Sequence, residues 1–141
     1  MTSPTVSAVL FDLDGTLIDT APEFIHIGLQ LRAEAGLPPI DAKTIWHSVS
    51  NGAIGMVEAA LEMPADDPAF EQWRQRFLTL YETGLGDLSH PYPGLPELVA
   101  GLDKARIAWG VVTNKLARFA LPLMDKMPFD PAAGAVVTPD H

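Results

Sequence analysis

Two carboxylates stand on alternate residues near the start of the chain, in the stretch AVLFDLDGTLIDT at residues 8–20. An apolar run ends at Asp12, and Asp14, Gly15 and Thr16 follow it. Asp and Gly are common after strands because both favour turns, so Asp-x-Asp alone is weak evidence for a site. Here the string is Asp-x-Asp-Gly-Thr-x-x-Asp and follows a predicted buried strand, which favours chemistry over a plain turn. Asp12 and Asp14 are therefore candidate catalytic residues.

A second polar cluster follows a second apolar run, Ile107 to Val112, in the stretch GVVTNK. Thr113 and Asn114 come directly after that run. One interpretation is that they cap the helix that follows. The other is that they bind a ligand together with Asp12 and Asp14.

The order of predicted elements explains why these residues could meet. We expect a strand over Ser7–Leu13 buried on both faces, a helical insert, a helix, a strand over 107–112, a helix interrupted by Pro122, and a short strand in AGAVVT. Strand–helix–strand units of this kind form right-handed parallel crossovers and a doubly wound, Rossmann-like α/β sheet. Ligands bind at the carboxyl ends of the strands in such sheets.

The insert reads as helical throughout, with recognisable helix starts. Thr20 and Glu23 have the spacing of a capping box, and a helix from there should stop at Gly36. Asp41 should cap a short second helix, and the helical pattern resumes after a break at SNG in AIGMVEAALEM. Asp67 should cap the last helix of the insert, which carries a stripe of aromatic side chains. This stripe indicates core packing rather than a ligand site.

Composition excludes several classes of function. The 141 residues include 9 basic and 18 acidic side chains and no cysteine. The net charge of −9 disfavours nucleic-acid and anionic-membrane partners, and a chain without cysteine has no disulfide or thiolate chemistry. We find no secretory or membrane-spanning pattern, so the expected location is the cytoplasm.

The stretch DLDGTLIDT resembles the first motif of the haloacid dehalogenase (HAD) superfamily, and GVVTNK resembles the second motif of its phosphoglycolate phosphatase branch. APEFI, AEAGLPP, SNGA and the ending VVTPDH are similar to bacterial N-acetylmuramic acid 6-phosphate phosphatases within that branch. The resemblance implies a HAD core over 1–19 and 86–141, with a small all-helical cap over 20–85.

The resemblance implies a phosphatase in which the two carboxylates have different roles. Asp12 would attack phosphorus and form an aspartyl-phosphate, while Asp14 would protonate the leaving oxygen and later deprotonate water. The cofactor would be Mg²⁺, bound by the Asp12 side chain and the Asp14 backbone carbonyl. The substrate would be a small phosphorylated metabolite, 2-phosphoglycolate or N-acetylmuramic acid 6-phosphate.

The resemblance also implies the residues that bind the substrate. The Thr113 hydroxyl and the Asn114 N–H would bind the phosphoryl group, with further N–H donors from Gly15 and Thr16. Lys115 would offset the acidic field at the site, or it is a solvated helix residue. In the cap, Asn51 and Gly52 are candidate contacts to the rest of the substrate, or they form an ordinary turn.

Two elements of the superfamily pattern do not occur in these 141 residues: a Lys before Pro, and a Gly-Asp-x-x-x-Asp pattern after a fourth strand. We therefore expect a C-terminally incomplete core, from a fragment or a truncated product, with the Asp12 strand at a sheet edge. The alternatives to a phosphatase are a non-catalytic product that keeps half the site and only binds a partner or phosphate weakly, and a sugar phosphomutase of the same superfamily. Oligomeric state stays open.

Overall fold

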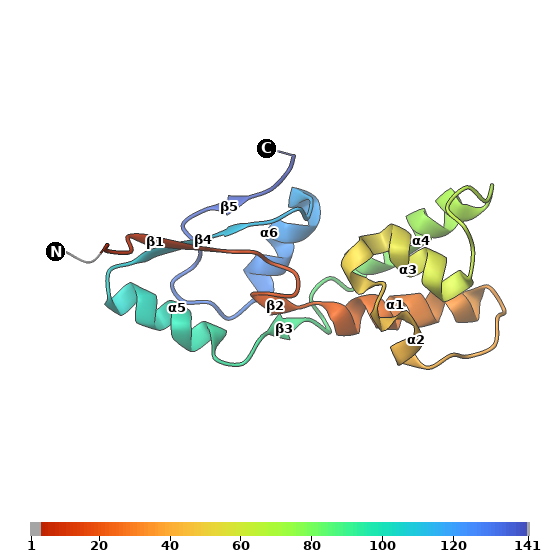
Figure 1. The fold of residues 1–141 in the computed structure, drawn as a ribbon, viewed down its shortest axis with the longest axis horizontal. Helices are drawn as coiled ribbons and strands as arrows, with labels where there is room; N and C mark the ends of the chain where they lie inside the picture. Colours follow the sequence, from red (N-terminus) through yellow and green to blue (C-terminus); the bar gives the residue numbers. More distant parts are fainter. Residues whose placement is uncertain (1–3, 141) are drawn as a thin grey trace. The chain divides into compact units, whose positions relative to one another are not determined.

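The computed structural model describes residues 4–140, so His141, the last residue of the VVTPDH stretch, lies outside the described residues. The chain divides into two compact units. Among the described residues, a sheet unit contains 4–19 and 90–140, and a helical unit spans Thr20–Ser89 (Figure 1). The helical unit therefore extends a few residues past the end expected for the cap, because the chain makes a turn over 84–89 before it enters the next strand.

Three parallel strands form the sheet of the sheet unit, in the order β1 (Ala8–Phe11), β4 (Ala108–Val112) and β5 (Val136–Val137). Each strand pair is parallel, which confirms the predicted α/β class. The crossovers contain α5 (Leu95–Lys104) and α6 (Ala117–Lys126), and α6 keeps Pro122 inside the helix. Among residues 4–140, β1 pairs only with β4 and forms one edge of this sheet, as expected.

The two faces of this sheet differ. Trp109 and Val111 point to a buried face, where Trp109 packs on Phe129 and donates its indole N–H to the Pro131 carbonyl oxygen at 3.0 Å. Leu10, by contrast, is 64% exposed. The prediction that the first strand is buried on both faces is therefore wrong, because only one face of β1 packs on described residues. The apolar run indicated the strand correctly and did not distinguish its two sides.

Close approach of strands explains one glycine in the middle of the sheet. Gly110 lies level with Leu10 in the β1–β4 register. A Cβ atom at Gly110 would lie 2.9 Å from the Ala135 carbonyl oxygen and 3.2 Å from Leu10 Cδ2. A backbone oxygen cannot move aside as the end of a flexible side chain can. β4 therefore lies this close to the Ala135 backbone, just before β5, only with glycine at position 110.

Two very short strands, which the sequence analysis did not predict, close the sheet unit where the chain leaves and re-enters it. β2 (Ile18–Asp19) pairs antiparallel with β3 (His90–Pro91). Just beyond this pair, the Tyr92 N–H donates to the Leu17 carbonyl oxygen at 3.2 Å. This pairing holds the segment that leaves the sheet unit beside the segment that re-enters it.

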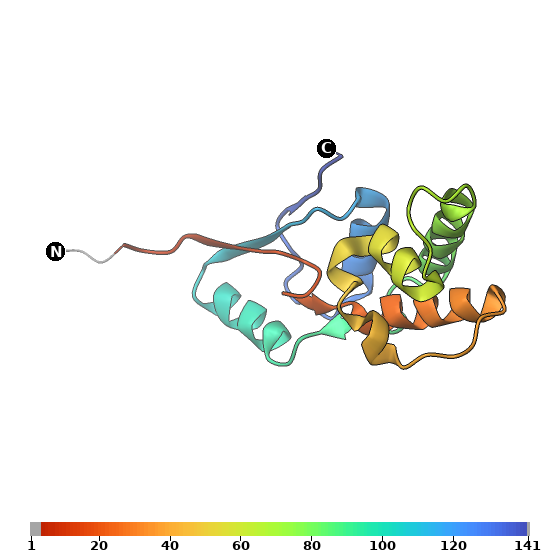
Figure 2. The same cartoon turned by 45° about the vertical axis from the view of Figure 1, so that its right-hand side comes forward.

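The helical unit contains α1 (Ala21–Glu34), α2 (Ala42–Trp46), the 3₁₀ helix η1 (Val49–Asn51), α3 (Gly52–Leu61) and α4 (Phe70–Thr83) (Figure 2). Its core confirms the predicted aromatic packing: Phe77 and Tyr81 are buried, and both contact Phe24 edge-to-face at 5.6 and 5.0 Å between ring centroids. Within this unit, Arg32 is buried and donates to the Ala60 carbonyl oxygen at 3.0 Å, which links α1 to the end of α3.

Two predicted helix caps are wrong, and one is confirmed. The Thr20 side chain makes no capping hydrogen bond, and the Glu23 carboxylate accepts from the Ser89 hydroxyl instead of the N-cap N–H. Asp67 accepts from the Ala69 N–H at 2.8 Å in a turn, and α4 begins after that turn. Asp41 caps α2 as predicted, by accepting from the Lys43 N–H at 2.9 Å.

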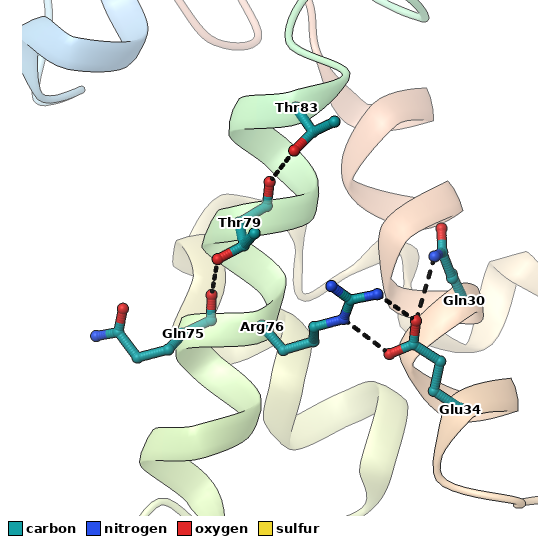
Figure 3. Close-up of polar contacts among 6 residues, drawn as sticks. All are labelled: Gln30, Glu34, Gln75, Arg76, Thr79 and Thr83. Carbon is teal, nitrogen blue, oxygen red and sulfur yellow. Dashed lines mark hydrogen bonds and ion pairs between the residues drawn. The ribbon is translucent and has the colours of Figure 1, made fainter.

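An ion pair joins the first and last helices of the helical unit. Arg76 on α4 reaches Glu34 on α1, with Nη2–Oε1 and Nε–Oε2 distances of 2.8 and 3.1 Å (Figure 3). Gln30 adds a third hydrogen bond to the same carboxylate. Hydrogen bonding from Arg76 lowers the pKa of Glu34 below its ordinary value. Because both side chains are partly exposed, the contribution of the pair to stability is modest and salt-dependent.

We predict that Gly110→Ala destabilises the chain by about 1–3 kcal/mol, because the new Cβ meets the Ala135 backbone. Gly101→Ala is the matched control, since a Cβ atom there meets nothing within 4 Å and α5 gains helix propensity of up to about 1 kcal/mol. Urea unfolding of both variants measures the difference. Equal free energies of unfolding for the two variants would contradict the close strand approach.

We predict that Arg76→Gln lowers the melting temperature slightly at pH 7 and has no effect in strong acid. The Glu34 pKa is lowered in the folded chain, so the pair stabilises fully above the ordinary Glu pKa of about 4.3 and loses this contribution as the pH falls through the folded pKa. Thermal unfolding of both proteins from pH 7 to about pH 2 tests this. A difference in melting temperature that grows as the pH falls would be the opposite result.

Candidate active site

The carboxyl ends of β1 and β4 lie side by side, because the two strands are parallel and in register. Phe11 pairs with Val111, so the residues that follow each strand emerge at the same edge of the sheet. Asp12 and Thr113 are the first residues after β1 and β4. The structure therefore places the two predicted polar clusters at one edge, within the sheet unit.

The two aspartates flank a fully buried leucine. Leu13 has no exposed surface, Asp12 is exposed, and Asp14 is partly buried. The Leu13 carbonyl oxygen accepts from the N–H groups of Leu17 and Ile18 at 3.0 and 3.1 Å, and this anchors the turn that follows β1. The Leu13 N–H donates to Asp12 Oδ1 at 2.8 Å, which orients that carboxylate. A buried residue between two polar ones holds both carboxylates on the solvent side of the turn.

The same turn engages two N–H groups that the sequence analysis assigned to phosphate. Gly15 has a φ of +76°, and its N–H donates to the Ile18 carbonyl oxygen at 3.0 Å. The Thr16 N–H donates to the Leu13 carbonyl oxygen at 3.3 Å. Both N–H groups therefore already have a partner in the turn, and their role as phosphate donors stays a prediction. Thr16 is exposed beside Asp14.

Thr113 is buried directly after β4 and makes hydrogen bonds to β5 and to Lys115. Its N–H donates to the Val137 carbonyl oxygen at 3.0 Å, and its hydroxyl oxygen accepts from the Lys115 N–H at 3.0 Å. A hydroxyl that accepts one hydrogen bond still has its own hydrogen to donate. Asn114 is exposed between these two residues. Thr113 thus stabilises a turn and does not cap the first N–H groups of α6.

Asp140, near the end of the described residues, caps α6 instead. Asp140 Oδ1 and Oδ2 accept from the Ala117 N–H at 3.0 and 3.3 Å. A carboxylate suits the N-terminus of a helix, where the N–H groups lack partners within the helix. Asp140 and Ala117 are 23 residues apart in the sequence, so no local pattern predicts this contact.

The sequence allows two interpretations of Lys115, and the structure pairs its side chain with Asp14. Its Nζ donates to Asp14 Oδ1 at 2.8 Å, and its side chain is only 7% exposed. The solvated-helix interpretation is therefore wrong, because the side chain lies buried against one of the two candidate carboxylates. Lys115 also precedes α6 rather than lying in it.

Divalent-metal binding was assigned to Asp12 and Asp14. Their oxygens are of the hard type that Mg²⁺ prefers. Across residues 4–140, however, no three His, Cys, Asp or Glu side chains gather closely enough to form a metal site. The two aspartates fit as part of a magnesium shell, and the described residues supply no third acidic ligand.

The predicted cap contacts lie in the helical unit. Asn51 is exposed at the end of η1, and Gly52 begins α3 with a φ of +67°. The same unit contains a cavity of about 430 Å³ between α1 and the end of α4. It is lined by Glu23, His26, Ile27, Gln30, Leu80, Thr83, Gly84, Asp87 and Leu88. Neither Asn51 nor Gly52 lines this cavity, so the two features are separate.

No helix within residues 4–140 combines the length and apolarity that a membrane crossing requires.

Among curated proteins, the chain is 48% identical to the N-acetylmuramic acid 6-phosphate phosphatase of Pseudomonas aeruginosa, over 96% of this chain and 60% of the relative. It is 42% identical to the protein of the same name from Pseudomonas putida, over 95% of this chain and 60% of the relative. It is 39% identical to a phosphoglycolate phosphatase of Agrobacterium fabrum, over 90% of this chain and 56% of the relative. The chain thus spans about three fifths of the length of these relatives.

Solved structures share the fold at low identity. A predicted phosphoglycolate phosphatase from Haemophilus somnus 129pt superposes with a TM-score of 0.77 at 22% identity, over 94% of this chain and 62% of that one. CbbY from Rhodobacter sphaeroides, in complex with phosphate, superposes with a TM-score of 0.68 at 19% identity, over 96% and 64% of the two chains. The sequence matches the family model for haloacid dehalogenase-like hydrolases over residues 9–141. The chain therefore belongs to the haloacid dehalogenase-like hydrolase family.

Proposed function

We propose that this chain forms the nucleophile-bearing part of a Mg²⁺-dependent phosphomonoester hydrolase. The observation that carries the proposal is the parallel register of β1 and β4, which places Asp12, Asp14 and Thr113 at one edge of the sheet. Its substrate is a small phosphorylated metabolite. N-acetylmuramic acid 6-phosphate is the first candidate and 2-phosphoglycolate the second, since the two relatives with the higher identities carry the former name.

Asp12 is the nucleophile in this proposal. Its Oδ1 accepts from the Leu13 N–H, so we assign the attack on phosphorus to Oδ2. As the new oxygen–phosphorus bond forms, the ester oxygen–phosphorus bond breaks and its electron pair stays on the leaving oxygen. The products of this step are an aspartyl-phosphate on Asp12 and an alcohol.

Asp14 moves the proton in both halves of the reaction. It protonates the leaving oxygen as the ester bond breaks, and the resulting carboxylate then takes a proton from water. That water attacks phosphorus, breaks the bond to Asp12 and releases inorganic phosphate. Asp14 is suited to this because its side chain is 36% exposed and can reach a substrate.

The Thr113 hydroxyl donates to a phosphoryl oxygen, with the Asn114 N–H and the N–H groups of Gly15 and Thr16 as further donors. Mg²⁺, when bound to the Asp12 side chain and the Asp14 carbonyl oxygen, neutralises charge so that the phosphate can approach an acidic site. Lys115 adds one positive charge at the same edge. Asn51 and Gly52 contact the non-phosphate half of the substrate.

We predict that Asp12→Asn lowers kcat by roughly 10⁴-fold or more, because the amide cannot form the acyl-phosphate. Asp14→Asn should lower kcat by roughly 10²- to 10⁴-fold on an alkyl phosphate, since only proton transfer is lost. The measurement is phosphate release from both candidate substrates with excess Mg²⁺. Asp103→Asn on the exposed side of α5 is the matched control and should retain wild-type turnover.

Two results decide against the proposal. Full hydrolysis by the Asp12→Asn variant would exclude Asp12 as nucleophile. Absence of turnover by the wild-type chain, with intact Mg²⁺ or phosphate binding, would favour the non-catalytic alternative.

A further inference from the structure

Lys115 is a buried cation at the edge where the candidate catalytic groups emerge. It lies three residues beyond the end of β4, and its side chain is 7% exposed, whereas that of its partner Asp14 is 36% exposed. A buried ammonium is costly unless it is paired. The lysine side chain is thus more enclosed by protein than the carboxylate that it binds.

Lys115 contacts both strand ends. Its Nζ donates to Asp14 Oδ1 at 2.8 Å, beyond β1, and its backbone N–H donates to Thr113 Oγ1 at 3.0 Å, beyond β4. A charge-assisted hydrogen bond of this length restricts the rotation of a carboxyl group more than a neutral one does. A single residue thus fixes the orientation of two groups that the proposed reaction uses.

We infer that Lys115 is a positioning residue that holds Asp14 for proton transfer to the leaving oxygen. This inference rests on the proposed function. Because Oδ1 accepts from the ammonium, the rotation of the Asp14 carboxyl group is fixed while the ester bond breaks. The proton that Asp14 gives to the leaving oxygen in the proposed reaction is thus delivered from one fixed orientation, and the carboxylate left behind stays paired with Lys115.

A change of leaving group distinguishes this positioning role from a merely structural one. An alkyl phosphate such as 2-phosphoglycolate needs a proton on its leaving oxygen, whereas 4-nitrophenyl phosphate expels a stable phenoxide without one. Lys115→Met should therefore lower kcat/KM on the alkyl ester by roughly 10²-fold and on the aryl ester by less than about threefold. Lys115→Arg keeps a cation at this position and should restore most of the alkyl-ester activity.

Lys104→Met is the matched control, because Lys104 is an exposed lysine at the end of α5 and its removal changes net charge equally. In an Asp14→Asn background, adding Lys115→Met should cause no further loss on the alkyl ester, since the carboxylate it positions is gone. Thermal unfolding of every variant reports whether the fold is kept. If Lys115→Met does not fold, the test uses Lys115→Arg instead. The ratio of its activity on the alkyl ester to its activity on the aryl ester should then equal the wild-type ratio.

Equal losses on the two esters, or additive losses in the Asp14→Asn background, would overturn the inference. A wild-type chain that hydrolyses neither ester would instead contradict the proposed function. In that case the contact itself is tested by ¹⁵N NMR, where the Lys115 ammonium hydrogens should be protected from exchange in wild type and unprotected in Asp14→Asn. Unprotected hydrogens in the wild-type chain would exclude the contact.

Discussion

The parallel pairing of β1 with β4 is the constraint on which the candidate site depends. Asp12 and Thr113 are far apart in the sequence, and they reach one edge only because Phe11 and Val111 are level in adjacent strands. A shift of one residue would turn every side chain of β1 to the opposite face. The register is supported by the buried face around Trp109 and by the glycine that lets β4 approach β5 closely.

The sheet unit is packed on one side, and this affects the strand that carries the nucleophile. Leu10, Val112 and Val137 are 64%, 44% and 44% exposed, and they belong to the face opposite Trp109 and Val111. An edge strand with apolar, uncharged side chains offers a surface for pairing with another chain. The orientation of Asp12 therefore rests on one neighbouring strand and on the Leu13-centred turn.

The sequence was sufficient to predict the parts of the fold that local patterns encode. Apolar runs located β1 and β4, helical spacing located α1, and the Asp41 cap located α2. The polar residues after each run indicated the candidate site, because parallel strands end at a common edge. The β2–β3 pair escaped prediction, since two-residue strands carry no periodic signal.

Several predictions were wrong or undecided for one reason, which is competition from partners distant in the sequence. Glu23 had the spacing of a capping box, and its carboxylate accepts from Ser89 instead, 66 residues away. Lys115 was ambiguous until the fold placed it against Asp14, 101 residues away. Asp140 became a helix cap only through tertiary contact with α6. Local spacing identifies which groups can act, and the fold decides which partner each one has.

The central claim is that Asp12 receives the phosphoryl group, and chemical trapping tests it most directly. During turnover with excess Mg²⁺ and substrate, borohydride should reduce an aspartyl-phosphate to homoserine, which peptide mass spectrometry would locate at position 12. We expect this modification at Asp12 alone, and none when substrate is omitted. Turnover that proceeds without any modification at Asp12, or with homoserine at another aspartate, would exclude Asp12 as the nucleophile.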